Sequence, residues 1–444
     1  MVQNSLTSII LWILFQLLIE VNCQMTPFNP KQRFIHTATL INNKLYISGG
    51  RNDNDVNAGK FIVNKEFFYL DVSVAFNTQN LSWVDLTSTS PVPIHSASTA
   101  VKGGANNNTL FIIGGITDKP IVLVYTFDTQ TNLWSNPKIG GIARNKSTMT
   151  GIIDHNGKVY LLNGADTLTV KDVIDMLILD TINLKWGKGS IVGASSASET
   201  YGAIYLISNN SIIYFGGYTN LSGGKSDFGG EIPLDQLFIY NTISDSWSTQ
   251  IAKGKIPSSR DGFSSILGLD GQKVIIFGGT SFAGSQSVPR EESLYELNLS
   301  TLEWYIPKVS ETSQFPSSRV YHQANVIGKY MVISFGAGYD PLTESHILLL
   351  DISNNDEYIW TNNFDLTSSN LATVTVTSIK TTATNVINIP NTQQSGRTLS
   401  NNKLIGAIVG SLIGGSLLTI GSFFIYKWNK NKRARNNIIK IPGS

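Results

Sequence analysis

The hydrophobic residues of this chain are arranged in six similar units. Each unit has an apolar run that ends in a pair of small residues, a second apolar run that ends in Asp or Asn, and then a tryptophan. The first runs lie at 45–50, 110–115, 159–164, 212–217, 274–279 and 331–337. The tryptophans, about 50 to 60 residues apart, are Trp83, Trp134, Trp186, Trp247, Trp304 and Trp360. A period of this length predicts a repeat architecture with one supersecondary element per unit.

Each unit is predicted to form four short strands. The apolar runs are rich in Ile, Val, Leu, Phe and Tyr, and no long amphipathic helix pattern interrupts them. Asn, Asp or Gly precedes the second strand of each unit, where a tight hairpin needs positive φ angles. These turns lie at 42–43, 106–108, 156–157, 209–210, 270–271 and 328. Four strands repeated six times predict an all-β fold, a six-bladed β-propeller around a central channel.

One apolar segment precedes the repeats. Residues 9–19 have the length of a signal-peptide core and lie ahead of a candidate cleavage site at 21–23, so 1–23 is predicted to be a signal peptide. A buried N-terminal helix is the alternative. The propeller is then expected over 24–366. A stalk rich in Thr, Ser and Asn is expected over 367–402, because that segment has too few apolar residues to fold compactly.

A longer apolar segment lies near the C-terminus. No charged residue interrupts 404–426, and about 20 apolar residues suffice to cross a bilayer. We predict a transmembrane helix over 403–426 and, because the residues after it are basic, a cytoplasmic tail over 427–444. The expected topology is a single-pass type I protein at the plasma membrane, with the propeller outside the cell.

The predicted membrane helix carries small residues four positions apart, at Gly406, Gly410 and Gly414. A second helix can pack closely on such a surface, so a helix–helix dimer is one hypothesis, and the general frequency of glycine in membrane helices is the alternative. Six of the 33 basic residues lie in the tail, so the net charge of +2 has a local origin. This distribution favours contact with anionic lipid and does not indicate nucleic-acid binding.

Cysteine usage excludes several kinds of site. The only cysteine, Cys23, lies at the predicted cleavage boundary, so the mature propeller is expected to have no disulfide, no cysteine zinc site and no cysteine nucleophile. Six Asn-X-Ser/Thr sequons fit an extracellular propeller, and we expect about half of them to carry glycans. The sequons begin at Asn80, Asn107, Asn145, Asn209, Asn220 and Asn298.

Over residues 30–365 the units resemble the kelch repeat, whose third strand ends in Asp or Asn. The matching positions here are Asp71, Asp128, Asp180, Asn241, Asn298 and Asp351. An Arg-x-x-His pattern before the first strand, as at Arg33 and His36, is also similar to the family. Units 3 and 6 depart from the Gly-Gly pair with 163–164 (Asn-Gly) and 336–337 (Gly-Ala). The resemblance includes the scaffold of galactose oxidase, but its copper-radical centre needs a tyrosine cross-linked to cysteine, which the position of Cys23 excludes.

In kelch propellers, the loops after the small-residue pair and the loops before each first strand share one face. The resemblance implies that the motif arginines and the residues after the pair line this face. These ligand-face candidates are Arg33, Arg51, Arg144, Tyr218, Arg260, Arg319 and Tyr339. The alternative is that the arginines only hydrogen-bond neighbouring blades together. The long loops 51–67, 218–235 and 280–292 of units 1, 4 and 5 are expected to carry recognition.

Metal sites and cofactors are not predicted. Asp53, Asp55 and Asn57 alternate like calcium ligands, but their loop lacks the glycine and glutamate that an EF-hand needs at its sixth and twelfth positions. Three histidines occupy the same position in different units and are expected to pack as scaffold. They are His36, His95 and His322.

The leading functional hypothesis is a membrane-anchored extracellular recognition module, without enzymatic activity, that binds a protein, peptide or glycan through its loop face. The first alternative is a carbohydrate-active enzyme, which needs carboxylates that converge on the channel. The candidates are Asp53, Asp227, Glu231 and Asp261. The second alternative is a structural or adhesion protein of the cell surface. Fold resemblance does not decide among these, because propellers host unrelated functions.

Overall fold

The structure is a computed structural model that describes residues 27–52, 62–63, 65–117, 123–167, 171–197, 199–219, 230–281 and 286–366. All of them belong to one of the two units into which the chain divides, Met1–Thr373. The predicted signal peptide, stalk, transmembrane helix with its glycines, and tail lie outside the described residues and stay predictions. Within the described ranges, no helix has the length and apolar character needed to cross a membrane.

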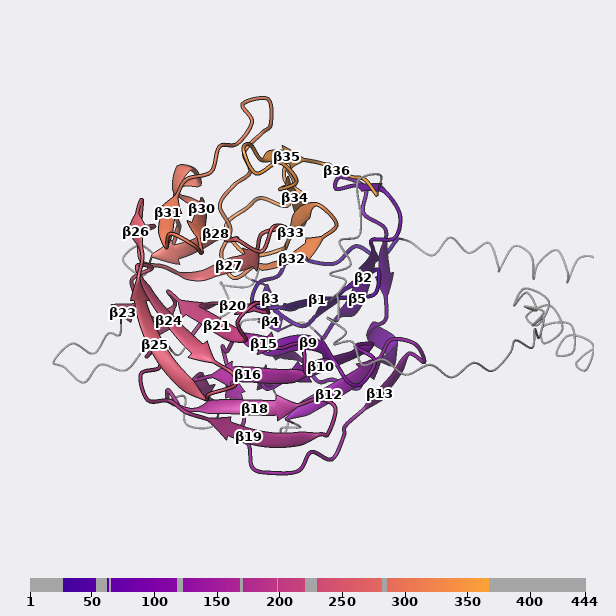
Figure 1. Ribbon diagram of the computed structural model, residues 1–444. Coiled ribbons are helices and arrows are strands. Elements are labelled where there is room, and N and C mark those ends of the chain that lie inside the picture. Colours follow the sequence, from indigo (N-terminus) through magenta and orange to yellow (C-terminus); the bar gives the residue numbers. More distant parts are fainter. Residues whose placement is uncertain are drawn as a thin grey trace, which may run out of the picture. The chain divides into compact units, whose positions relative to one another are not determined.

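Six antiparallel sheets follow one another along the chain and confirm the six-bladed propeller (Figure 1). Blade 1 consists of β1 (Thr37–Ile41), β2 (Lys44–Ser48), β5 (Phe67–Asp71) and β7 (Trp83–Asp85). Blade 2 consists of β9 (Thr99–Gly103), β10 (Thr109–Ile113), β12 (Val124–Asp128) and β13 (Leu133–Ser135). Blade 3 consists of β15 (Gly151–Ile153), β16 (Lys158–Leu162), β18 (Met176–Asp180) and β19 (Lys185–Gly189). Blade 4 consists of β20 (Gly202–Leu206), β21 (Ser211–Phe215), β24 (Gln236–Asn241) and β25 (Ser246–Ile251). Blade 5 is built on β27 (Asp261–Leu267), β28 (Lys273–Ser281), β30 (Leu294–Asn298) and β31 (Glu303–Tyr305). Blade 6 consists of β32 (Gln323–Ile327), β33 (Tyr330–Ser334), β34 (Ile347–Asp351) and β35 (Ile359–Thr361). Blade 5 gains β26 (Lys253–Gly254) and β29 (Gln286–Ser287) at its edges.

The first strand of each blade lies innermost. β1, β9, β15, β20, β27 and β32 contact one another in this order, and β32 returns to β1, so these strands surround the central channel (Figure 1). All six repeat tryptophans lie in the fourth, outermost strands.

Short strand pairs confirm which loops share a face. Each pair includes the segment that follows a small-residue pair. In blades 2 and 3 this segment pairs with the segment before a first strand, and in blades 1 and 4 it pairs with a later part of its own loop. The pairs are β8 (His95–Ser96) with β11 (Ile116–Thr117), β14 (Lys146–Ser147) with β17 (Ala165–Asp166), β3 (Arg51–Asn52) with β4 (Ile62–Val63), and β22 (Tyr218–Thr219) with β23 (Gly230–Glu231). There are also two single turns of 3-10 helix among the described residues, η2 (Thr87–Thr89) and η3 (Arg290–Glu292). The face that carries these pairs is the loop face.

The hydrophobic core lies between the blades. Each of the six buried clusters joins one blade to the next, because the second and third strands of a blade bury side chains on both of their faces. Between blades 4 and 5, for example, Phe215, Val274 and Trp304 pack together. Burying one such side chain contributes about 1.5–3 kcal/mol, so adjacent blades stabilise each other mainly through these clusters.

The small-residue pair is a pair of consecutive left-handed residues. Gly49 and Gly50 have φ angles of 65° and 97°, and the Gly50 N–H donates to the His95 carbonyl of blade 2 over 3.0 Å. In blade 3 the first position is Asn163, with a φ of 47°. In blade 6 the pair is Phe335–Gly336, at φ 49° and 102°, and not the expected Gly336–Ala337. Glycine therefore occupies the second position in every blade, whereas the first position also accepts Asn163 and Phe335.

A clasp between blades 6 and 1 closes the ring. β6 (Phe76–Asn77), which interrupts the connection between the last two strands of blade 1, pairs antiparallel with β36 (Asn363–Phe364), which follows β35. The Phe76 and Phe364 rings stack with centroids 4.6 Å apart. The Gly336 N–H donates to the Arg33 carbonyl across the same seam over 2.8 Å. Residues 371–379, the strand-like stretch considered for closure, lie outside the described residues.

Candidate functional site

Six left-handed residues form a ring at the loop-face end of the channel, each just before a first strand or at its start. They are Ile35, Ala97, Thr148, Thr200, Gly262 and Tyr321, with φ angles of 47° to 64°. Backbone hydrogen bonds link five of the neighbouring pairs in the ring. Ala97 donates to Ile35 over 3.0 Å, Thr148 to Ala97 over 2.9 Å, Thr200 to Thr148 over 3.1 Å, Tyr321 to Gly262 over 2.7 Å and Ile35 to Tyr321 over 2.9 Å. Left-handed residues other than glycine cost about 1–3 kcal/mol each and gather at functional sites. We call this ring the rim.

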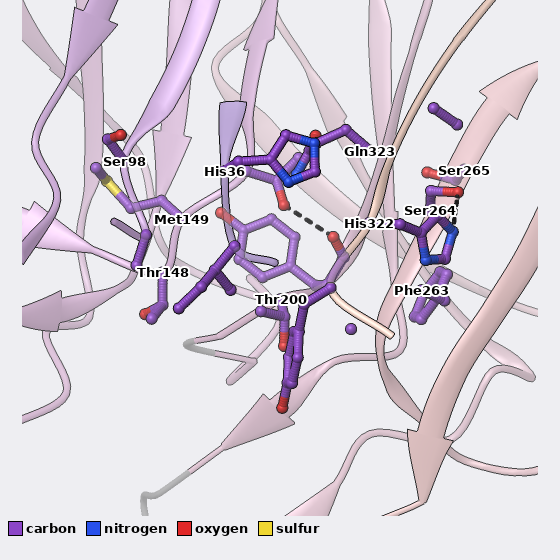
Figure 2. Close-up of a pocket in the computed structure, with 17 residues that line it drawn as sticks. His36, Ser98, Thr148, Met149, Thr200, Phe263, Ser264, Ser265, His322 and Gln323 are labelled. Atoms are coloured by element: carbon purple, nitrogen blue, oxygen red, sulfur yellow. Dashed lines mark hydrogen bonds between the residues drawn. The ribbon is translucent and has the colours of Figure 1, made fainter. Parts of the chain in front are cut away.

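A small polar cavity lies in the channel beside the rim. Its volume is about 120 Å³, and its lining includes His36, Thr148 and His322 (Figure 2). Pockets for small ligands usually measure about 300–1,000 Å³, whereas a water molecule takes about 30 Å³. The cavity therefore has room for a few waters, and a larger ligand has to lie across the half-buried rim side chains.

The three histidines join blades, as expected for scaffold residues, but they do not all occupy one position. His36 and His322 each follow a left-handed residue of the rim, whereas His95 lies two residues before Ala97, at the position of Arg33 in blade 1. His36 Nε2 lies 3.1 Å from Ser334 Oγ of blade 6, and His95 Nε2 lies 3.2 Å from Ser48 Oγ of blade 1. His322 Nε2 lies 2.7 Å from Ser264 Oγ of blade 5, a contact that Figure 2 shows. Burial lowers the pKa of all three, that of His322 to about 3. They are neutral at pH 7 and do not face a ligand as cations.

One side of the rim is acidic. Asp261, only 8% exposed, accepts hydrogen bonds on Oδ2 from Thr200 Oγ1 over 2.9 Å and from Tyr321 Oη over 3.1 Å. Burial raises the pKa of Asp261. Burial also raises the pKa of Glu199 to about 6, with the charges of Asp172 and Asp261 adding to the effect. Perturbed carboxyl groups at the end of a channel indicate a functional surface on physical grounds.

Three of the motif arginines are buried and do not line the loop face. Arg33, Arg260 and Arg319 are 0% exposed, which corrects their assignment as ligand-face residues. Arg260 Nη1 donates to the Gly278 and Glu292 carbonyls over 3.2 and 2.7 Å, and Arg319 Nη1 to the Phe335 carbonyl over 3.1 Å. They fix the small-residue pairs within their own blades, whereas the alternative weighed above had them hydrogen-bond neighbouring blades together.

The corresponding residue of blade 3 is Lys146, and the assignment of Arg144 is wrong in register. Arg144 is exposed, whereas Lys146 is buried, pairs with Asp175 and donates to the Leu161 carbonyl over 3.3 Å. Burial lowers the pKa of Lys146, although Asp175 opposes the shift. The sequence signal was the spacing to Met149, which equals the spacing from Arg33 to His36.

The other candidates are dispersed. Arg51 and Tyr218 are half-buried on the loop face, in β3 and β22, and Arg51 Nε donates to Ser96 Oγ over 3.1 Å. Tyr339 is 7% exposed, and its ring lies 3.7 Å from the Arg319 guanidinium carbon. The structure thus brings Arg319 and Tyr339 together, but beneath the surface. Of the seven candidates, only Arg51, Arg144 and Tyr218 keep exposed or half-buried side chains.

Of the four carboxylates considered for catalysis, two lie among the described residues. Asp53 and Asp227 lie outside the described residues. Glu231 lies in β23 and its charge adds to the raised pKa of Asp261. Among the described residues, no group of three or more His, Cys, Asp or Glu side chains is arranged to hold a metal ion.

Comparisons with known proteins place the repeats. A family model described as the KLHDC2/KLHL20/DRC7 Kelch-repeats domain matches residues 35–227 and 219–406. Similar proteins include a probable serine/threonine-protein kinase of Dictyostelium discoideum, 27% identical over 55% of this chain and 20% of its own length. Acyl-CoA-binding domain-containing protein 4 of Arabidopsis thaliana is 25% identical over 62% of this chain and 38% of its own. Kelch domain-containing protein 3 of Homo sapiens is 25% identical over 44% of this chain and 47% of its own.

The match spans less than half the length of each of these relatives. Among solved structures, that of YjhT superposes with a TM-score of 0.55 at 14% identity, over 76% of this chain and 99% of that one. At this identity the likeness concerns the fold alone.

Proposed function

Since the chain belongs to the kelch-repeat family, we propose that it is a protein-interaction module whose partner binds the loop face across the rim. The rim carries this proposal. Ile35, Thr148, Thr200 and Tyr321 hold strained left-handed conformations and keep half-buried side chains at the end of the channel. A rigid scaffold that presents irregular segments on one face is the usual basis of recognition.

We propose binding without turnover. The hydroxyl groups of Thr200 and Tyr321 both donate to the Asp261 carboxylate. This carboxylate therefore orders the rim and is poorly placed to transfer protons. Glu199 has no such clamp among the described contacts and, with a pKa raised by burial to about 6, is charged at pH 7. A partner segment with a basic side chain near Glu199 is the form of ligand that this side of the rim favours.

We further propose that the propeller lies outside the cell at the plasma membrane, held by the helix predicted over 403–426. The support is the apolar length of 404–426 and the basic residues after it. Digestion of intact cells with protease, with detection of the C-terminus, tests this topology. Loss of the propeller with a protected C-terminal fragment is expected, and complete protection of the chain would contradict it.

Selection of peptides against the full-length chain tests the interaction proposal. Selected peptides are expected to lose about tenfold or more in affinity on Glu199→Lys, because a like-charge contact replaces an attraction. Glu311→Lys, at an exposed carboxylate outside the rim, is the matched control and should leave the affinity unchanged. Equal loss in both variants, or in neither, would contradict binding across the rim.

A further inference from the structure

A second and larger hollow lies away from the channel, at the seam between blades 6 and 1. Its volume is about 500 Å³, and it shares no lining residue with the channel cavity. Three segments line it: 27–29 ahead of blade 1, 78–83 after the clasp strand β6, and 341–346 between β33 and β34. This volume falls within the range of about 300–1,000 Å³ that is usual for small-ligand sites.

The hollow continues across blade 6. A neighbouring hollow of about 140 Å³ reaches the connection between blades 5 and 6 at Gln314 and Pro316. The two hollows share four lining residues, Gln79, Thr343, Glu344 and Ser345. Together they form one groove, which we call the seam groove.

Hydrogen bonds across the seam fix the walls of this groove. The Thr78 N–H donates to the Asn362 carbonyl over 2.8 Å, and Thr78 Oγ1 donates to Asn362 Oδ1 over 3.1 Å. Ser345 Oγ donates to the Thr78 carbonyl over 2.5 Å. The groove is therefore preorganised, and a ligand need not order its walls on binding.

The seam groove carries no uncompensated charge. Its two ionisable lining residues are Glu344 and His346. The Ser317 N–H donates to Glu344 Oε1 over 2.9 Å, and Arg319 lies 3.5 Å from Glu344 Oε2. Burial lowers the pKa of His346 to about 4, so it is neutral at pH 7. A charged ligand would gain no partner there to offset its loss of water.

The remaining lining is of two kinds, side-chain amides and hydroxyls on the one hand and apolar surfaces on the other. Gln79 is exposed, and no contact among the described residues engages its side-chain amide, whereas the amide of the neighbouring Asn80 is a predicted glycosylation site. Leu342 is 92% exposed and Phe28 presents a half-buried ring, whereas Trp83 is 8% exposed and packs mostly within the core. A sugar ring presents hydroxyl edges that pair with amides and apolar C–H faces that pack on such rings.

We propose that the seam groove binds an uncharged oligosaccharide. The occupant follows from the absence of free charge in the lining, the unengaged Gln79 amide together with the half-buried Phe28 ring, and a length that runs from blade 1 to the connection between blades 5 and 6. This site is separate from the rim, and the two proposals do not depend on each other.

Saturation-transfer NMR on the full-length chain with cellobiose, mannobiose and N,N′-diacetylchitobiose tests this inference. Every protein carries Ser82→Ala, which removes the Asn80 sequon without changing a lining residue, so that no attached glycan fills the groove. At least one sugar is expected to bind with a Kd of about 1 mM. Gln79→Ala should weaken binding about fivefold through the loss of one hydrogen bond.

Gln130→Ala, at an exposed glutamine in a turn of blade 2, is the matched control and should leave the affinity unchanged. Glu199→Lys at the rim should also leave it unchanged, which separates this test from that of the protein partner. Absence of binding for all three sugars, or equal affinity in the Gln79→Ala and Gln130→Ala proteins, would overturn the proposal.

Discussion

At the residue scale, the second position of each small-residue pair has no room for a side chain. A Cβ on Gly50 would lie 2.8 Å from His36 Cβ and 3.0 Å from the Phe34 carbonyl oxygen. Gly50→Ala should therefore combine backbone strain of about 1–3 kcal/mol with an overpacking cost of similar size. Urea unfolding of the full-length chain measures the loss.

Gly271→Ala is the matched control, because Gly271 is also left-handed, at φ 67°, but a Cβ there meets nothing within 4 Å. It should carry the backbone strain alone. Equal destabilisation by the two substitutions would show that close packing at Gly50 contributes nothing.

The buried histidines predict acid sensitivity. The pKa of His322 falls from 6.5 to about 3 on burial. Below about pH 6.5 the His322 imidazole therefore binds a proton in the unfolded chain but not in the folded chain. This contribution to stability is full above pH 6.5 and is lost as the pH falls, by about 1.4 kcal/mol per pH unit. Unfolding of His322→Gln should show a slope smaller by that amount between pH 6 and pH 4.

Glu199 acts in the opposite direction, because its pKa of about 6 lies above its usual 4.5 and its contribution is lost as the pH rises through this window. The histidine effect is therefore read from the difference between His322→Gln and His155→Gln, a change at an exposed histidine. Identical slopes in these two variants would contradict it.

The limits of sequence reasoning are clear from single residues. The histidines were assigned correctly to the scaffold, although only His36 and His322 share one position and His95 replaces the motif arginine of blade 2. Lys146 was missed because Arg144 has the expected residue type, although the three-residue spacing to Met149, the burial of Lys146 and its ion pair with Asp175 distinguish the two. Phe335 was missed because a left-handed phenylalanine contradicts the usual preference for glycine.

At the element scale, the four strands of each blade followed from the apolar pattern, whereas the clasp did not. β6 and β36 are two residues long, and a pairing of Phe76 with Phe364 leaves no periodicity in the sequence. The ends of the third strands could be predicted from the sequence, because the Asp or Asn there forms a turn with nearby backbone. Asp71 Oδ1 accepts from the Ser73 N–H over 2.8 Å, and Asn241 Oδ1 accepts from the Ile243 N–H over 2.9 Å. Such local turns need only nearby residues.

The clasp predicts a local effect of substitution. Phe364 is 2% exposed, and Phe364→Ala should cost about 3–5 kcal/mol by leaving a cavity at the seam. Hydrogen exchange should accelerate first in β6, β36 and the outer strands of blades 1 and 6. Phe238→Ala, at a half-buried phenylalanine of blade 4, is the control. In this variant the amides of the seam should exchange as slowly as in the unmodified protein. Seam exchange that is unchanged in Phe364→Ala would contradict closure by the clasp.

At the scale of the whole molecule, the proposed extracellular location predicts selective glycosylation. Asn80, Asn107 and Asn209 are exposed, so a glycosyltransferase has access to their amides. Asn145 is half-buried, and its Nδ2 donates to Thr167 Oγ1 over 2.8 Å. Mass spectrometry of the protein from secretory cells should find glycans at the exposed sequons and none at Asn145. Full occupancy of Asn145 would contradict this reading.

The central claim is that the partner of this kelch propeller binds across the rim. Hydrogen exchange of the full-length chain, with and without a selected peptide, tests it most directly. The account predicts slower exchange in the segments around Ile35, Thr148, Thr200 and Tyr321, and no change in the hairpin turns at the opposite ends of the strands, such as 156–157. Protection confined to those turns, with the rim segments unchanged, would contradict the account.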